Sequence, residues 1–237
     1  MRTLLRLLLT TLLAGAVLWV TLPLAASTLA RGAVVAAGLE GEDIEVTVLA
    51  DPPLKLLLLE ADAVRISAGL GTWRGISFTG IDATVATTRL GGPLGAVEAR
   101  LEGVQLPGED GARLRVGTVL VSGPLASADL RIRLSRDDVE VALRQALPPD
   151  LGSLADAITL APPDGLRIAT AGGDVAARLI LRPDGSLDLS VDGPGGSSVT
   201  VTVLRAGAAL PVRLQSVTVD DSWVELRGTL DARDLGL

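Results

Sequence analysis

The spacing of hydrophobic residues changes near residue 41 of the chain. Residues 7–30 contain no charged side chain, and about 20 apolar residues are enough to span a bilayer. Beyond residue 41, apolar positions alternate with polar ones, first over residues 44–48. A period of two is typical of strands with one buried face. The pattern therefore predicts an apolar N-terminal helix followed by a largely β domain.

Two arginines, Arg2 and Arg6, precede the apolar run, and Pro23 follows its most apolar part. Basic residues keep the leading end of a membrane helix in the cytoplasm, so we expect residues 24–237 to form a single extracytoplasmic domain. Residues 1–23 are then a retained signal anchor or a signal peptide cleaved near residues 25–27. The apolar run exceeds the usual signal-peptide core of about 7–15 residues, which favours the anchor. We expect a single-pass protein of the cell membrane, or a protein secreted to the periplasm or envelope if the leader is removed.

Small residues dominate the stretch from 24 to 41 and predict that a helix continues or restarts after Pro23 and ends at residues 38–41. In the strand pattern beyond it, the apolar phase slips by one position at Gly80 and again at Gly103. Such a slip turns the apolar face to solvent unless a bulge or bend absorbs it. We therefore expect roughly nine to eleven strands in a strongly curved sheet, together with two or three helices.

Local signals mark one helix and one hairpin in the second half of the chain. Ser135 and Asp138 form a variant of the capping box, and apolar residues follow at helical spacing up to residue 146. Residues 183–186 read Pro-Asp-Gly-Ser between two alternating stretches, which predicts a tight turn between paired strands.

The segment from Asp51 to Glu60 contains five leucines that lack the alternation of a strand. Pro52 or Pro53 is suited to the first turn of a short helix. Such a helix is apolar around most of its circumference, so it is either buried or in contact with something apolar. It either plugs the open side of the curved sheet or forms part of a lipid-facing mouth.

Composition narrows the chemistry. The chain is 48% apolar with a mean hydropathy of +0.47 but only 2% aromatic, so its interior is aliphatic. It has no His, Cys or Tyr, which excludes Ser-His-Asp and Cys-His nucleophiles and thiolate or imidazole metal sites. The net charge of -7 disfavours nucleic acid as a partner.

Carboxylates are the remaining candidates for acid–base chemistry. Adjacent pairs at residues 109–110, 137–138 and 220–221 are the candidates considered. All lie in predicted turns or at a helix start, where acidic residues are ordinary caps. We therefore expect no catalytic residue, no metal site and no cofactor, and a protein that is not an enzyme.

Several stretches of the chain follow one another in a recognisable order. They are the two prolines before residues 56–59, and residues 44–49, 63–66, 76–81, 134–135, 217–219 and 224–226. This order of elements resembles the LmeA-like family of phospholipid-binding proteins of the bacterial cell envelope. The resemblance runs from about residue 22 to the end of the chain and is carried by hydrophobic patterns. Glu60 departs from it, since such proteins more often have a glycine or small residue there.

The resemblance implies an α+β fold in which a strongly curved antiparallel sheet wraps around one or two helices, as in tubular lipid-binding domains. It also implies an extracytoplasmic protein that binds or transfers phospholipid, with the acyl chains in an aliphatic groove. The alternative is a non-catalytic envelope scaffold that pairs with partners through its sheet edges. The partners expected are phospholipid and, through the first helix, the membrane. The groove residues expected to face inward or toward its mouth are Leu54, Leu56, Leu57, Leu58, Val64, Ile66, Ile76 and Phe78.

Overall fold

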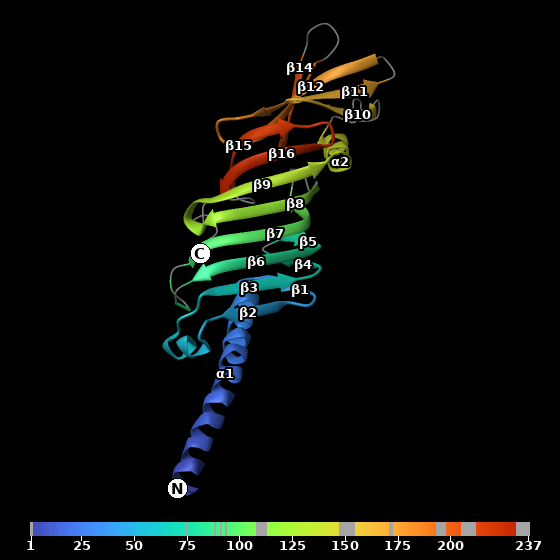
Figure 1. Ribbon diagram of the computed structural model, residues 1–237. Coiled ribbons are helices and arrows are strands. Elements are labelled where there is room, and N and C mark those ends of the chain that lie inside the picture. The colour runs from blue at the N-terminus through green and yellow to red at the C-terminus, as the bar shows by residue number, and fades with distance from the viewer. Residues whose placement is uncertain are drawn as a thin grey trace.

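A long N-terminal helix leads into a tall stack of antiparallel strands, shown in a computed structural model (Figure 1). The helix projects from one end of the stack, and a second, smaller sheet lies at the other end. The structure describes residues 2–73, 75–87, 89–90, 92, 94–107, 113–146, 155–170, 173–192, 198–204 and 212–230, with side chains of the first helix described from Val17 onward.

Helix α1 (Arg2–Ala36) has 35 residues and contains Pro23 in its interior. A proline removes one helical hydrogen bond and kinks or breaks the helix, but here the helix continues through it. The residues that follow are rich in alanine, the best helix former. Gly38, with a φ of 96°, ends the helical region, as glycine commonly does after a helix.

Most of the described strands form one antiparallel sheet of eleven members. Its main path runs β1-β4-β5-β7-β8-β9-β16-β15, and a branch from β7 continues through β6 and β3 to β2. The strands are β1 (Leu39–Gly41), β2 (Glu45–Leu49), β3 (Ala63–Ala68), β4 (Gly71–Trp73), β5 (Ile76–Phe78), β6 (Gly80–Thr87), β7 (Leu94–Pro107), β8 (Arg113–Pro124), β9 (Ala128–Ser135), β15 (Val212–Val219) and β16 (Trp223–Leu230).

The predicted slips at Gly80 and Gly103 mark this branch and are not bulges. The first part of β7 pairs with β6 as far as Glu102 opposite Gly80, whereas Gln105 pairs with Ser77 of β5. Gly103 lies between the two partners and has a φ of 56°. The left-handed φ of Gly103 interrupts the extended backbone at the point where the partner of β7 changes from β6 to β5.

A second sheet of five strands, ordered β10-β11-β12-β13-β14, follows helix α2 (Arg136–Ala146). The predicted turn at residues 183–186 is confirmed, because it joins β12 to β13 in antiparallel register. The strands are β10 (Ala155–Ala161), β11 (Gly165–Thr170), β12 (Gly173–Leu181), β13 (Leu187–Asp192) and β14 (Ser198–Leu204).

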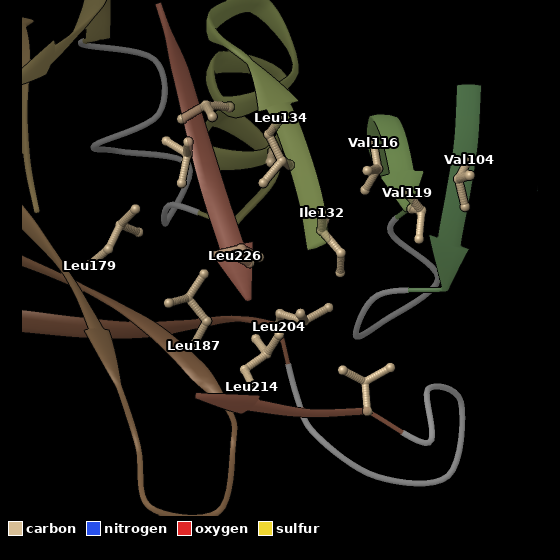
Figure 2. Close-up of a cluster of buried hydrophobic side chains, with 14 of the residues drawn as sticks. Val104, Val116, Val119, Ile132, Leu134, Leu179, Leu187, Leu204, Leu214 and Leu226 are labelled. Carbon is tan, nitrogen blue, oxygen red and sulfur yellow. The ribbon is translucent and has the colours of Figure 1, made fainter. Parts of the chain in front are cut away.

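One continuous hydrophobic core joins the two sheets (Figure 2). Side chains of the large sheet, such as Ile132 and Leu226, point toward Leu179, Leu187 and Leu204 of the small sheet. The buried residues are almost all aliphatic, as the composition predicts. The core therefore holds residues of both sheets in one packed unit.

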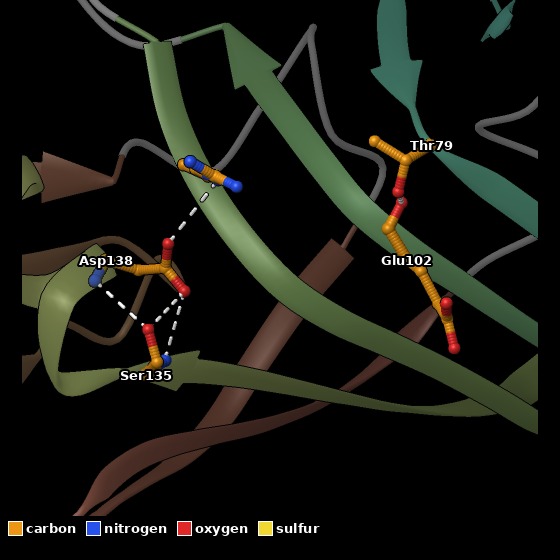
Figure 3. A network of polar contacts seen from close by, with 5 residues as sticks. Thr79, Glu102, Ser135 and Asp138 are labelled. Carbon is orange, nitrogen blue, oxygen red and sulfur yellow. Dashed lines mark hydrogen bonds and ion pairs between the residues drawn. The ribbon is translucent and has the colours of Figure 1, made fainter. Parts of the chain in front are cut away.

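The predicted cap of α2 is confirmed (Figure 3). The Ser135 hydroxyl donates to the Asp138 carboxylate at 2.7 Å and accepts from the Asp138 backbone N–H at 3.2 Å. The Ser135 backbone N–H also donates to that carboxylate at 3.2 Å. These bonds satisfy donors that a helix start would otherwise leave unpaired, so Asp138 acts as a structural cap.

The α+β class with an antiparallel sheet and an apolar N-terminal helix is confirmed. The expectation of nine to eleven strands is too low, since sixteen are described. The three-residue strands β1, β4 and β5 are too short to show a period of two. Residues 38–41, where the sequence predicts the end of the helix, also contain β1. The large sheet is an open path in the described part of the chain.

Candidate functional site

The site begins where α1 meets the edge of the large sheet. Leu22, Ala26, Ala30 and Val34 of α1 pack against buried residues of the domain. They recur every four residues and so follow one side of the helix. The half of α1 beyond Leu22 therefore belongs to the folded domain.

By length and composition, α1 is apolar enough to cross a membrane. Its mean hydropathy is 1.4 over Val17–Ala36, the part whose side chains are described. Leu22 is the first of the described α1 side chains that packs on the domain. A span of about 20 residues that starts after Arg6 rises about 30 Å at 1.5 Å per residue and ends near Ala26, so its last turns overlap the first residues that pack on the domain.

The predicted short helix in the leucine-rich segment is confirmed as the 3-10 helix η1 (Pro53–Leu58). It starts directly after Pro52 and ends at Leu59, which has a left-handed φ of 58°. Leu56 is its buried residue, in a cluster with Val48 and Ala61 that packs against Leu22 and Ala26 of α1. Helix η1 is therefore seated against the side of α1.

The other leucines of this segment face outward. Together with the last residue of β2 they form an exposed surface that we call the leucine patch, each member being 43–68% exposed. Scattered exposed leucines are ordinary, but a contiguous group marks a contact surface. The leucine patch consists of Leu49, Leu54, Leu57, Leu58 and Leu59.

Polar contacts hold the leucine patch in place. Lys55 Nζ donates to Asp62 Oδ1 at 2.9 Å, and the backbone N–H of Asp51 donates to Asp62 Oδ2 at 2.7 Å. The Lys55 bond, followed by the Asp51 bond, holds the pKa of Asp62 below its ordinary value. The backbone N–H of Leu90 donates to the carbonyl of Leu59 at 2.7 Å. These bonds fasten both ends of η1 to the sheet.

The structure divides the predicted groove residues into two groups. Leu54, Leu57 and Leu58 belong to the leucine patch, and Leu56 lies buried behind it. The strand residues lie on the apolar face of the large sheet. Phe78 is buried there, and Val64, Ile66 and Ile76 are partly buried against the same core. Val64 also packs against the Leu56 cluster, so it connects the two groups.

A cavity lined wholly by apolar side chains lies between α2 and the two sheets. Its volume is about 30 Å³, and its lining includes Leu143, Leu187 and Leu226. This volume equals about one water molecule's share of the liquid. An acyl chain needs far more room, so this cavity is a packing defect of the core.

The opposite face of the large sheet carries a polar groove of about 790 Å³ that the sequence analysis did not identify. It crosses β6, β7, β8, β9, β15 and β16, and its lining carries as many basic as acidic side chains. This balance favours neither an anion nor a cation. The charged lining residues are Asp82, Glu98, Arg100, Asp129, Arg131 and Arg227.

Glu225 lies at one end of this polar face and is only 2% exposed. Its carboxylate accepts hydrogen bonds from Arg133 Nε at 2.9 Å and Arg227 Nε at 2.6 Å, and Arg131 Nε lies 3.9 Å away. Burial raises the pKa of Glu225, but the bonds from Arg133 and Arg227 outweigh it, so the pKa lies below its ordinary value. Each of its two oxygens thus accepts a hydrogen bond from an arginine, which makes Glu225 a structural ion-pair centre. The alternation of Arg131 and Arg133 could have signalled this polar face.

Among the residues that the structure describes, no group of three acidic side chains is placed to hold a metal ion. Asp137 and Asp138 lie in the first turn of α2, and Asp220 and Asp221 lie in the turn between β15 and β16. The pair at residues 109–110 lies outside the described residues.

No protein-family model, curated protein or solved structure matches this chain.

Proposed function

We propose that the protein is a membrane-anchored, extracytoplasmic phospholipid-binding or lipid-transfer protein of the bacterial cell envelope, without enzymatic activity. The observation that carries this proposal is the position of the leucine patch. Its buried partner Leu56 belongs to a cluster that packs against Leu22 and Ala26, where the stretch of about 20 α1 residues available to the bilayer ends. An apolar surface is thus fixed beside the place where a membrane helix enters the domain.

Lipid acyl chains are the apolar partner available at that place. In this proposal a chain leaves the bilayer over Leu57 and Leu58 and contacts the aliphatic face that begins at Val64 and Ile66. Burial of each methylene contributes about 0.8 kcal/mol, so a few contacts are enough to hold a chain end. Curvature of the large sheet around this face, as in tubular lipid-binding domains, would shield the chain from water.

The test is lipid capture by the full chain. The protein, purified in a mild detergent, is extracted with organic solvent, and co-purified lipid is quantified by mass spectrometry. In parallel, the chain in donor vesicles is assayed for transfer of a fluorescent phospholipid to acceptor vesicles. We expect stoichiometric phospholipid and protein-dependent transfer. Protein without lipid that also fails in transfer contradicts the proposal.

A matched pair of variants separates binding from folding. Leu57 and Leu70 are both 58% exposed, but Leu70 lies in the turn between β3 and β4. We expect Leu57→Glu to lower lipid uptake with little change in the free energy of unfolding, and Leu70→Glu to leave uptake unchanged. If Leu57→Glu lowers lipid uptake and the free energy of unfolding to the same degree, the result instead supports η1 as a plug that only packs against the sheet.

A scaffold role is the second candidate, and the edge strand β14 favours it. This strand pairs only with β13 in the described part of the chain. Its sequence, residues 198–204, contains no charge and no proline, which are the usual protections of an edge against pairing with another chain. Lipid-free protein that captures an envelope protein through β14, with capture lost in Thr200→Pro, would favour this role.

A further inference from the structure

We propose that the leucine patch inserts into the interfacial region of the same bilayer that α1 crosses, so that the sheet stands on the membrane at two points. This inference rests on the anchoring part of the proposed function and does not require lipid transfer. Its occupant is the lipid surface itself.

The depth of the patch follows from α1. A hydrocarbon span of about 20 residues that starts after Arg6 ends near Ala26, which places Leu22 and Ala26 in its last turns, close to the membrane surface. Trp19, half-exposed, lies one turn before Leu22, near the end of the span, where indole rings are enriched. Since the Leu56 cluster packs against Leu22 and Ala26, and η1 contacts α1, η1 lies at the level of that surface.

The direction of the patch follows from the split of η1. Leu56 is buried in the cluster that packs against α1, while Leu54, Leu57 and Leu58 are exposed. In Figure 1 the short helix lies at the end of the sheet from which α1 projects. The exposed leucines are thus held beside the emerging helix, where they meet lipid without any movement of the fold.

The charges around the patch indicate an apolar contact. Asp51, Glu60 and Asp62 are acidic, whereas the basic residues nearby include Lys55, which is bonded to Asp62, and Arg89. The surface carries no excess of positive charge, so anionic lipids gain nothing from it. We expect insertion into zwitterionic phosphatidylcholine to be at least as strong as into anionic bilayers and to be insensitive to salt.

The absence of cysteine allows a direct measurement on the full chain. Single cysteines are introduced as Leu58→Cys in the patch, Leu13→Cys in the membrane half of α1, and Asp221→Cys in the distant turn between β15 and β16. Each is labelled with an environment-sensitive fluorophore and reconstituted into phosphatidylcholine nanodiscs. Quenching is measured with lipids that carry a doxyl group near the headgroup end of the chain, and with aqueous iodide.

We expect the label at position 58 to be quenched several-fold more by the doxyl lipid than the label at 221, and to be protected from iodide. A label at 58 that behaves like the one at 221 overturns the inference. A label at 58 that is shielded from both quenchers also overturns the inference, because a protein surface then covers the patch. If the label at 13 is also exposed to iodide, the membrane anchor fails, and the proposed function fails with it.

A second measurement uses the matched leucines. Energy transfer from a label at 221 to acceptor lipids reports the height and tilt of the sheet above the bilayer. The double variant Leu57→Asp/Leu58→Asp is expected to change this transfer, whereas Leu70→Asp leaves it unchanged. An unchanged transfer in the double variant contradicts docking at two points.

Discussion

The Ser27 hydroxyl of α1 accepts a hydrogen bond from the backbone N–H of Val48 in β2, with an N···O distance of 3.0 Å. In the described part of the chain β2 pairs only with β3, so this bond gives a partner to a donor at the sheet edge. The Val48 side chain lies buried in the same cluster as Leu56. One bond therefore joins the helix to the sheet beside the leucine patch.

Replacing Ser27 is expected to loosen this junction. Ser27→Ala leaves the Val48 N–H without its partner, which costs about 1–3 kcal/mol for a buried donor. The free energy of unfolding of the full chain in detergent and the hydrogen exchange of the Val48 amide measure the effect. Thr28→Ala is the control, because the Thr28 hydroxyl bonds only the Leu24 carbonyl of its own helix. Equal effects of both substitutions would contradict the role of Ser27.

Glu225 is expected to make stability depend on acid. Its folded pKa lies below the unfolded value because Arg133 and Arg227 outweigh burial. The stabilisation is therefore complete above the unfolded pKa of about 4.3 and is lost as the pH falls through the folded pKa. Glu225→Gln should lower stability at neutral pH by about 1–3 kcal/mol and flatten the decline in acid. Urea midpoints measured against pH test this.

Glu98 provides the control for that series. It is an exposed carboxylate of β7 on the same polar face. Glu98→Gln is expected to change stability by no more than about 0.5 kcal/mol and to keep the acid dependence of the unaltered protein. If stability falls with pH in the same way in Glu225→Gln and in the unaltered protein, Glu225 is not the source of the acid dependence.

Gly103 is expected to tolerate no side chain. Its φ of 56° is costly for other residues, and a Cβ would lie 2.4 Å from Oγ1 of Thr79, whose hydroxyl donates to the Glu102 carbonyl. We expect Gly103→Ala to cost about 1–3 kcal/mol, measured by denaturant unfolding. Gly80→Ala meets nothing within 4 Å and is expected to be neutral or slightly stabilising. An unchanged free energy of unfolding in Gly103→Ala would mean that the backbone at the branch point can adjust to the added side chain.

Two adjacent leucines are expected to differ sharply in stability. Leu56 is 6% exposed and Leu57 is 58% exposed. Leu56→Ala leaves a cavity between η1 and α1 and should cost about 2–5 kcal/mol. Leu57→Ala should change the free energy of unfolding by no more than about 0.5 kcal/mol. Unfolding in detergent measures both, and similar losses would mean that the leucine patch is part of the core.

The strand pattern was readable from the sequence because alternation is a property of consecutive residues. The hairpin turn and the α2 cap were readable for the same reason, since each depends on residues within four positions. The branch at Gly103 was visible only as a slip of phase. The slip does not reveal that β7 pairs with β6 along its first part and with β5 near its end, because long-range packing sets the partners.

The sequence by itself determined the apolar leader, the aliphatic interior, the alternation of the strands and the short helix after Pro52, because each follows from local spacing and composition. Only the tertiary structure decided that Leu56 is buried in a cluster that packs against α1 while its neighbours are exposed. It also decided that Glu225 meets Arg133, 92 residues away in the chain. Both depend on which distant segments lie side by side, and a run of identical leucines carries no local signal of which side will be covered.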